Sequence, residues 1–196
     1  MLIYVVRHGQ TDWNAERRLQ GQKDIPLNVI GREQARLNGI DMAEILRVEA
    51  ISFDFVASPL QRTRETMEIM RTAMGLPPRD YRSDDRLVEV SFGDWEGFTI
   101  RELKATQRER IIERNINKWD FIPPGDYAES YEIMSWRIRS WLNSVERPTV
   151  CVTHGGVIRS LFKMIADLPK HEAAEGEIPQ DRILKIDTAK RLIGWI

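Results

Sequence analysis

Two histidines in this sequence stand in matching surroundings that suit chemistry on a bound ligand. His8 ends the apolar run of "YVVRHGQ", His154 ends that of "TVCVTHGG", and glycine follows each of them. A single histidine in such a place can be a polar residue that only satisfies the end of a strand. Because two of the three histidines in the chain share this context, we expect them to serve one site.

Two arginines indicate the charge of the ligand. Arg7 lies between a buried-looking strand and His8, where a permanent charge is costly without a partner. Arg62 falls near the start of an expected helix, where the helix dipole disfavours a cation. Surface pairing of Arg62 with Glu65 or Glu68 is the alternative. If both arginines instead face one crevice, they form a fork for a doubly charged oxyanion such as phosphate.

Phosphoryl transfer through histidine needs a neutral imidazole, cationic donors around the phosphoryl oxygens and an acid for the leaving oxygen. The backbone amides that follow Gly155 would add further donors. Spacing alone leaves three candidates for the acid, namely Glu89, Asp94 and Glu96. The sequence has no H-E-x-x-H, aspartate-rich or Walker pattern, so we expect neither a metal site nor a cofactor.

The elements that must position these residues follow from the hydrophobic pattern. Short apolar runs predict strands over Leu2–Val6, Phe53–Ala57 and Thr149–Thr153, and residues 182–196 alternate like a hairpin. Helical spacing lies between these runs, which predicts an α/β layered domain with a largely parallel sheet, one domain over residues 1–196. Ligands of such sheets bind outside the carboxyl ends of the strands, where His8, Ser58 and His154 would meet.

Finer expectations concern helix faces, caps and tryptophans. Ser58 is predicted to cap a helix that starts at Pro59, with Gln61 completing the capping box, and Thr99 with Glu102 to start another. Residues 10–26 read as a long loop, Cys151 as a small buried hydrophobe and His171 as a surface residue. The residues expected to face inward or pack between helices are Ile30, Leu37, Ile40, Ala43 and Leu46 on the helix Asn28–Leu46, and Trp119, Trp136 and Trp141.

Several segments together resemble the histidine phosphatase superfamily, the family of cofactor-dependent phosphoglycerate mutases and related phosphatases. "VVRHGQTDWN" resembles its R-H-G-[EQ]-[ST]-x-x-N signature, and "ASPLQRTRETMEIM" its S-x-L-x-R block. "DDRLVEVSFGDWEGFT" and "VTHGGVIR" resemble two later motifs, in the family's order. The resemblance implies a three-layer α/β/α sandwich with a mostly parallel central sheet.

The resemblance also implies roles for individual residues. His8 would be the nucleophile that becomes phosphohistidine, and Glu89 the proton donor that later activates water. His154 is expected in its protonated form near a bound phosphate. The residues implied to hold the phosphoryl oxygens or to line the substrate pocket are Arg7, Arg62, His154, Asn14, Gly155, Gln20 and Gly21.

The chain departs from the family's pattern in one pocket wall. Where many members carry Gly-Glu-Ser after a Pro-x-Gly turn, "PPGDYAES" has Ala128 before Glu129. The segment from Glu89 to Glu129 is shorter than in the mutases, and a more open site admits water. We therefore expect a metal-independent phosphomonoesterase, with a 2,3-bisphosphoglycerate-dependent phosphoglycerate mutase or a non-catalytic phosphate-binding scaffold as alternatives.

Composition narrows the partners. With 42% hydrophobic residues, 30% charged residues and a formal net charge of -1, the chain gives no overall reason to expect nucleic acid or a membrane as partner. The N-terminal apolar run meets Arg7 too soon for a signal peptide or membrane span, so we expect a cytoplasmic protein. We expect a small phosphorylated substrate, and the sequence makes no prediction of oligomeric state.

Overall fold

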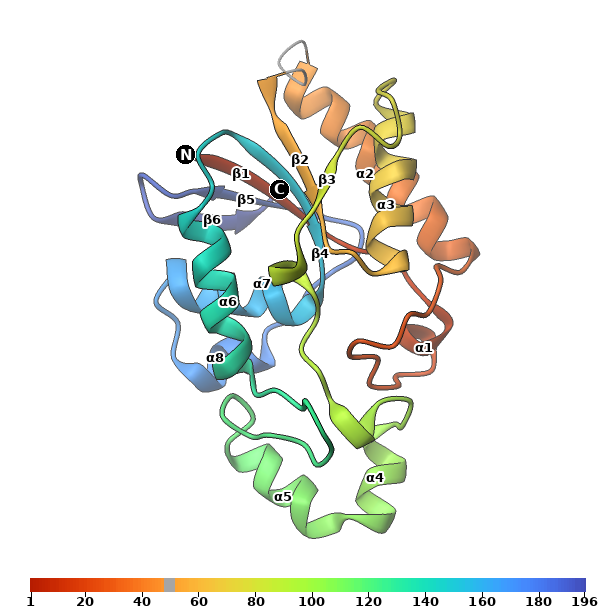
Figure 1. Cartoon of the computed structure of the whole chain (residues 1–196), viewed down its shortest axis with the longest axis vertical. Coiled ribbons are helices and arrows are strands. Elements are labelled where there is room, and N and C mark those ends of the chain that lie inside the picture. Colours follow the sequence, from red (N-terminus) through yellow and green to blue (C-terminus); the bar gives the residue numbers. More distant parts are fainter. Residues whose placement is uncertain (48–51) are drawn as a thin grey trace.

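A six-stranded sheet forms the centre of the molecule in a computed structural model, which describes residues 1–47 and 52–196 (Figure 1). The strand order is β3-β2-β4-β1-β5-β6. The first four of these pair in parallel, and β5 runs antiparallel to both β1 and β6, so the predicted C-terminal hairpin is confirmed. The strands are β1 (Leu2–Arg7), β2 (Asp54–Ala57), β3 (Arg82–Ser83), β4 (Thr149–Thr153), β5 (Ile183–Asp187) and β6 (Leu192–Trp195).

Side chains that alternate along the strands divide the core between the two faces of the sheet. Tyr4 and Val6 of β1 belong to a cluster with residues of α2 (Val29–Leu46) and α3 (Gln61–Ala73). Ile3 and Val5 belong to another with residues of α6, α7 and α8. Helices thus cover both faces, and the expected three-layer α/β/α sandwich is confirmed (Figure 1). The second set of helices is α6 (Tyr131–Asn143), α7 (Gly155–Ile165) and α8 (Lys170–Glu175).

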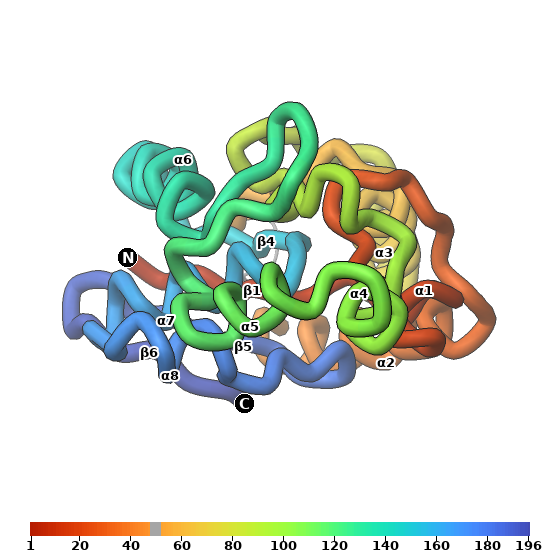
Figure 2. The backbone as a smooth tube through the Cα atoms, turned by 90° about the horizontal axis from the view of Figure 1, so that it is seen from below, coloured from red at the N-terminus to blue at the C-terminus, as the bar shows by residue number. Residues whose placement is uncertain are grey.

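Three further helices lie beyond the carboxyl ends of the parallel strands (Figures 1 and 2). They are α1 (Asp12–Ala15), α4 (Ile100–Thr106) and α5 (Arg108–Ile116). A small cluster of Trp95, Leu103, Ile111 and Phe121 holds α4 and α5 together. The chain reaches them through two short 3-10 helices, η2 (Asp85–Leu87) and η3 (Gly93–Trp95). These segments form the wall opposite the strand ends.

The inward face predicted for α2 is wrong at Ile30, Leu37 and Ile40, which are exposed, while Ala43 is half-buried. Ile30 and Leu37 are 57% and 47% exposed, whereas Leu46 is buried. The buried face contains small residues instead, Gly31 and Gly39 among them. A Cβ on Gly39 would lie 2.6 Å from the carbonyl oxygen of Met70 in α3. The glycines therefore mark the side on which α2 packs closely, and the larger aliphatic residues lie outward.

The cap predicted for α3 is also wrong. This helix begins at Gln61, after an N-cap at Leu60 that makes no side-chain hydrogen bond. The Ser58 hydroxyl lies 2.8 Å from Nε2 of His154 and does not cap the helix. By contrast, the predicted capping box of Thr99 and Glu102 is present at the start of α4.

Two other local expectations fail. The stretch 10–26 contains the short helix α1, whose capping box joins Thr11 and Asn14. Trp136 is 64% exposed, although Trp119 and Trp141 are buried as predicted. Trp136 therefore lies on the exposed side of α6.

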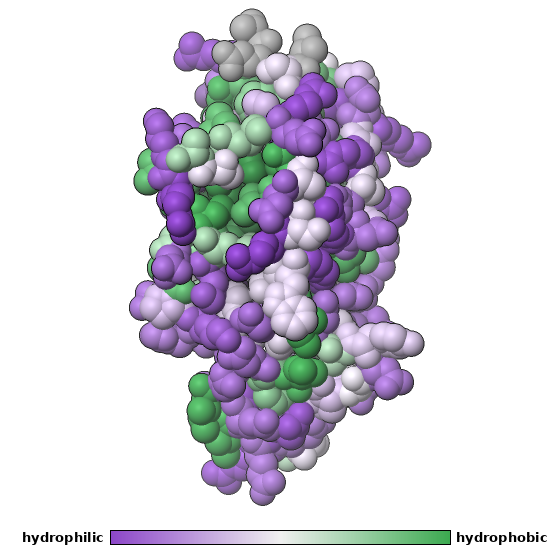
Figure 3. Space-filling view, turned by 60° about the vertical axis from the view of Figure 1, so that its left-hand side comes forward, coloured by the Kyte–Doolittle hydropathy of each residue, from purple (hydrophilic) through white to green (hydrophobic). Residues whose placement is uncertain are grey.

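Hydrophilic side chains cover much of the face shown in Figure 3, and hydrophobic ones gather mainly in its upper half. Within the described residues, no helix combines the length and apolar character needed to cross a bilayer.

Candidate active site

The ends of the parallel strands bring three predicted residues together. His8 directly follows β1, Ser58 follows β2 and His154 follows β4, and these strands are neighbours in the sheet. The His8 amide donates to the Thr153 carbonyl at 2.9 Å, and the two imidazole rings lie 5.2 Å apart. The meeting point predicted from the strand ends is therefore present.

His8 is buried as a neutral imidazole with a defined tautomer. Its Nδ1 lies 2.8 Å from the carbonyl oxygen of Gly9, which can only accept, so Nδ1 carries the proton. Nε2 keeps its lone pair and accepts a hydrogen bond of 3.3 Å from Nε of Arg62. Burial, followed by the charges of Arg62 and Arg7, holds the pKa of His8 well below its usual range. These surroundings favour a neutral His8.

Arg62 faces this site and not the helix surface. Its guanidinium is fully buried and donates to the carbonyl oxygens of Lys23 and Gly21, each at 2.7 Å. Glu65, the suggested surface partner, pairs with Arg32 instead. Burial lowers the pKa of Arg62 to about 10, so it stays charged at neutral pH.

Arg7 is a second cation with an incompletely satisfied head group. One terminal nitrogen donates to the Ile178 carbonyl at 2.7 Å. Its buried Nε has no hydrogen-bond partner among the described residues. Burial and the nearby charge of Arg159 lower the pKa of Arg7 to about 10. The unpaired donor is the kind of group that an anion in the pocket would satisfy.

The surroundings of His154 favour its neutral form. It is the N-cap residue of α7, fully buried, with Nε2 on the Ser58 hydroxyl and Nδ1 unpartnered within the described chain. Burial, followed by the charge of Arg62, lowers the pKa of His154 well below its usual range. Without an anion in the pocket, desolvation and neighbouring cations therefore favour the neutral form. The protonated form expected beside a bound phosphate stays a prediction.

Glu89 is the one of the three candidate acids that lines the pocket with His8. Both of its carboxylate oxygens accept from the Gly156 amide, at 3.1 Å each. Asp94 is exposed, and Glu96 accepts from the amides of Gln22 and Phe92 at 2.9 and 3.2 Å. The Gly156 amide, which was expected to donate to the bound anion, thus donates to Glu89 and holds its carboxylate in place.

The remaining predicted positions surround a pocket of about 210 Å³. The Asn14 side-chain oxygen accepts from Gln180 at 3.2 Å, and Gln20 accepts from the Thr11 hydroxyl at 2.9 Å. Gly21 has a φ of 52°, and a Cβ there would overlap the Glu96 carboxylate. Of the predicted site residues, His154 alone is not among those that line the pocket, although its ring lies 5.2 Å from that of His8. The predicted residues that line it are Arg7, His8, Asn14, Gln20, Gly21, Arg62, Glu89 and Gly155.

Several pocket residues were not predicted, and most of them are cationic. Arg114 and Lys118 come from α5 and the turn after it, where cations four residues apart were a usable signal. Arg159 stands inside "VTHGGVIR" but received no role from the motif. The other unpredicted lining residues are Arg18, Leu19, Phe92 and Tyr131. The altered "PPGDYAES" segment contributes none of the lining residues found within the described chain.

A family model for the histidine phosphatase superfamily (branch 1) matches residues 3–192. The chain belongs to this superfamily. Phosphoglycerate mutase-like protein 4 of Arabidopsis thaliana is 36% identical over 167 residues, covering 82% of this chain and 69% of the plant protein. The probable phosphoglycerate mutase GpmB of Citrobacter koseri is 34% identical over 205 residues, covering 99% and 89%.

A solved structure agrees with the fold of this chain. A mycobacterial glucosyl-3-phosphoglycerate phosphatase superposes with a TM-score of 0.73 at 29% identity, covering 94% of this chain and 88% of the mycobacterial one. These relatives are thus named as a mutase-like protein, a probable mutase and a phosphatase, and phosphoglycerate is part of each name.

Metal-binding groups and the single cysteine were also subjects of prediction for this chain. Across residues 1–47 and 52–196, no three histidine, cysteine, aspartate or glutamate side chains are grouped as metal ligands. Cys151 is buried in β4, and burial raises the pKa of its thiol far above the usual range. The prediction of a small buried hydrophobe at this position is confirmed.

Proposed function

We propose that the protein hydrolyses phosphomonoesters, without a metal ion, through a phosphohistidine on His8. The observation that carries this proposal is the state of His8. Its imidazole is neutral, its Nε2 lone pair lies in the pocket, and Arg62 and Arg7 stand beside it. A neutral nucleophile next to fixed cationic donors is the arrangement that transfer of a phosphoryl group requires.

Each residue then has a defined part in two steps. Nε2 of His8 attacks phosphorus, the bond to the ester oxygen breaks, and Glu89 gives its proton to that oxygen. Water next attacks the phosphohistidine, Glu89 takes a proton from it, and the phosphorus–nitrogen bond breaks. Arg7, Arg62, Asn14 and the Gly155 amide would stabilise the phosphoryl oxygens, and neutral His154 would contribute one ring N–H.

The test is the substitution His8→Ala, assayed with 4-nitrophenyl phosphate. We expect turnover to fall at least about a thousandfold, because the covalent intermediate cannot form. Rapid quenching of the wild type in an alkaline denaturant should also trap a base-stable, acid-labile phosphoprotein that His8→Ala lacks. His171→Ala, at a side chain that is 81% exposed, is the matched control. Near-wild-type turnover by His8→Ala would refute the proposal.

A mutase is the alternative that the names of the relatives favour. Primed with 2,3-bisphosphoglycerate, a mutase converts 3-phosphoglycerate to 2-phosphoglycerate, whereas a phosphatase releases inorganic phosphate. Measuring both products in one reaction separates the two activities. Binding of phosphate with neither product would indicate a non-catalytic protein.

The additional cations favour a substrate with a second negative group. Arg114 and Lys118 are half-buried in the pocket wall, and burial lowers the pKa of both. Glu175 partly compensates, since it pairs with Lys118 at 3.1 Å, and Arg159 adds a further positive charge nearby. Cations gathered in this way are stabilised by an anion. We propose that a carboxylate or second phosphate of the substrate lies here.

A pair of matched substrates tests this preference. 3-Phosphoglycerate and glycerol 3-phosphate differ chiefly in the carboxylate. We expect Arg114→Ala to lower kcat/KM for 3-phosphoglycerate by about tenfold or more, the usual effect of losing a charged hydrogen bond, and to spare glycerol 3-phosphate. An equal loss with both substrates would contradict a second anion subsite.

A further inference from the structure

Glu89 stands on a segment that no regular element fixes. Residues 88–92 lie between η2 and η3 and have neither helix nor strand structure. A group that exchanges a proton with substrate must be held to within about 0.5 Å, which loops seldom achieve unaided. Something outside the segment must therefore fix its backbone.

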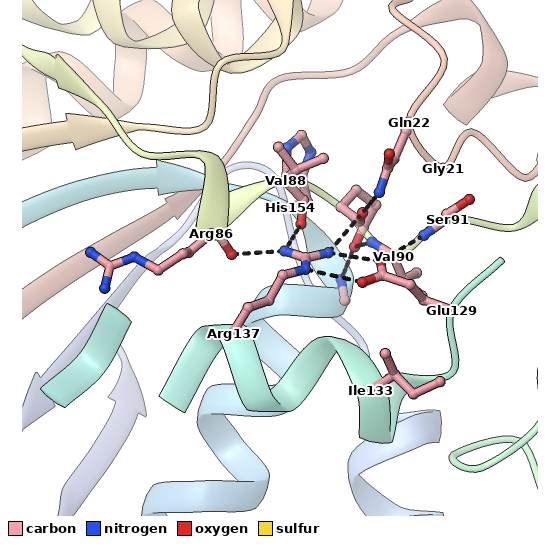
Figure 4. Close-up of polar contacts among 12 residues, drawn as sticks. Gly21, Gln22, Arg86, Val88, Val90, Ser91, Glu129, Ile133, Arg137 and His154 are labelled. Carbon is pink, nitrogen blue, oxygen red and sulfur yellow. Dashed lines mark hydrogen bonds and ion pairs between the residues drawn. The ribbon is translucent and has the colours of Figure 1, made fainter. Parts of the chain in front are cut away.

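Arg137 of α6 supplies much of that support. One terminal nitrogen donates to the carbonyl oxygens of Arg86, at 2.7 Å, and Val88. The other donates to the carbonyl oxygen of Glu89 itself at 3.1 Å. Figure 4 shows the Arg137 guanidinium between these carbonyls on one side and Glu129 on the other. One side chain thus ties three carbonyls within four residues to a helix.

Glu129 extends the support past Glu89. Its carboxylate accepts from Nε and a terminal nitrogen of Arg137, at 3.1 and 2.9 Å. It also accepts from the Ser91 amide at 3.2 Å, while the Glu129 amide donates to the Ser91 carbonyl at 2.9 Å. The ion pair therefore holds the chain on both sides of Glu89.

We propose that Arg137, with Glu129, is a positioning residue for the proton transfer by Glu89. Neither side chain lines the pocket, and the hydrogen bonds of the pair end on the backbone around Glu89, although the charge of Arg137 also helps to lower the pKa of His154. The two side chains are 22% and 17% exposed, a costly setting for charges unless their hydrogen bonds are well made. Arginine suits the task because its planar fork reaches several acceptors at once, which a lysine ammonium does not. This inference rests on the role of Glu89 in the proposed function.

The choice of leaving group isolates proton donation from general damage. An alkyl phosphate expels a basic oxygen that needs a proton, whereas 4-nitrophenyl phosphate expels a stable anion that hardly needs one. Since kcat/KM reports the steps up to phosphoryl transfer, the ratio of kcat/KM for the alkyl to the aryl substrate measures the contribution of the acid.

The experiment is Arg137→Lys, with kcat/KM measured for glycerol 3-phosphate and 4-nitrophenyl phosphate, alongside Tm. We expect the alkyl-to-aryl ratio to fall by about tenfold, part of the hundredfold or more that general acid catalysis supplies. Arg71→Lys is the matched control. Arg71 is a buried arginine of α3 that donates to the Pro77 carbonyl at 2.8 Å and lies 3.6 Å from Asp80. Its substitution should lower Tm and leave the ratio unchanged.

Two comparisons decide the outcome. Glu89→Gln must lower the same ratio, and an unchanged ratio there would refute the role of Glu89 and thus the proposed function. If Glu89→Gln lowers the ratio but Arg137→Lys slows both substrates equally, the positioning role is wrong. Should Arg137→Lys not fold, Glu129→Gln is read in the same way, with a fall in the ratio expected. Failure of both variants to fold would assign the pair to stability and overturn the inference.

Discussion

His8 and His154 are buried in the same cationic surroundings, yet their hydrogen bonds give them different properties. The Gly9 carbonyl fixes the proton of His8 on Nδ1, which leaves the lone pair on Nε2, where it accepts a hydrogen bond from Arg62. His154 instead contacts the Ser58 hydroxyl through Nε2. Both are held neutral by burial and by nearby arginines. Protonation of either histidine therefore lowers the free energy of unfolding.

Stability should fall as the pH drops through the usual histidine range. The pKa values of His8 and His154 are lowered in the folded protein, so below about pH 6.5 the unfolded chain binds protons that the folded chain does not. Stability is then fully present above that pH and is lost progressively below it, by up to about 1.4 kcal/mol per pH unit for each histidine. Urea denaturation between pH 8 and 5.5 measures the slope.

The control for this slope is the third histidine. His171→Asn, at an exposed position of α8, should leave the pH dependence unchanged, whereas His154→Asn should remove about half of it. A wild-type stability that stays constant from pH 7.5 to 5.5 would mean that the histidines are not held neutral.

At the scale of elements, α2 shows how a single helix serves both packing and the site. Its first turn lies against the chain that leaves His8, where a Cβ on Gly31 would be 2.1 Å from the Gln10 carbonyl oxygen. Eight residues later, Gly39 approaches α3 almost as closely. The same substitution at the two glycines should therefore have different consequences.

Gly31→Ala should impair both activity and stability, and Gly39→Ala stability alone. Alanine favours a helix by up to about 1 kcal/mol over glycine, but forced contacts in a packed interface cost about 1–3 kcal/mol, so a net loss is expected at both sites. At Gly31 the shift reaches His8, and a displacement of 1 Å can cost about a hundredfold in kcat/KM. Urea denaturation and hydrolysis of 4-nitrophenyl phosphate report the two effects.

Leu37→Ala is the control on the same helix, since Leu37 is 47% exposed and should tolerate the change. Unchanged kcat/KM in a destabilised Gly31→Ala protein would show that α2 does not influence the nucleophile.

The elements also show which parts of the site the sequence could predict. Strand ends were located correctly because short apolar runs stop at polar residues, and parallel strands place those stops at one edge. The inward face of α2 was missed because close helix contacts select glycine, which a search for large apolar side chains ignores. Ser58 fits an N-cap pattern, but a buried imidazole across the sheet edge binds its hydroxyl.

The cationic side of the pocket was the least predictable part. Arg114 and Lys118 belong to a wall whose place is set by the path of the chain after Glu89 and by the small α4–α5 cluster. The spacing of these two cations marks them as a pair, but nothing in the sequence between them and His8 predicts that they lie in the same pocket. Positioning by Arg137 was equally hidden, because its partners are backbone carbonyls, which every residue has.

At the scale of the whole molecule, the sheet and the α4–α5 segment share a packing residue. Phe92 packs against the cluster between the sheet and α6–α8 and also against the cluster of Trp95, Leu103, Ile111 and Phe121. We propose that residues 1–196 form one folding unit for this reason.

A single cooperative transition is therefore expected on unfolding. In hydrogen exchange followed by mass spectrometry across a urea series, peptides from residues 100–116 and 131–165 should lose protection at the same urea concentration. Earlier loss in 100–116 would show that α4 and α5 unfold as a separate unit.

The bonds around His8 join the two ends of the chain, and this has a consequence for its synthesis. Arg7 donates to the Ile178 carbonyl, and the Gln180 side chain donates to the carbonyl oxygen of His8 itself. Strand β1 pairs with β4 and β5, both made late. At translation rates of about 5–20 residues per second, β1 waits on the order of ten seconds with both edges unpaired. His8, translated well before β4, β5 and Gln180, is thus among the last groups to acquire its final surroundings.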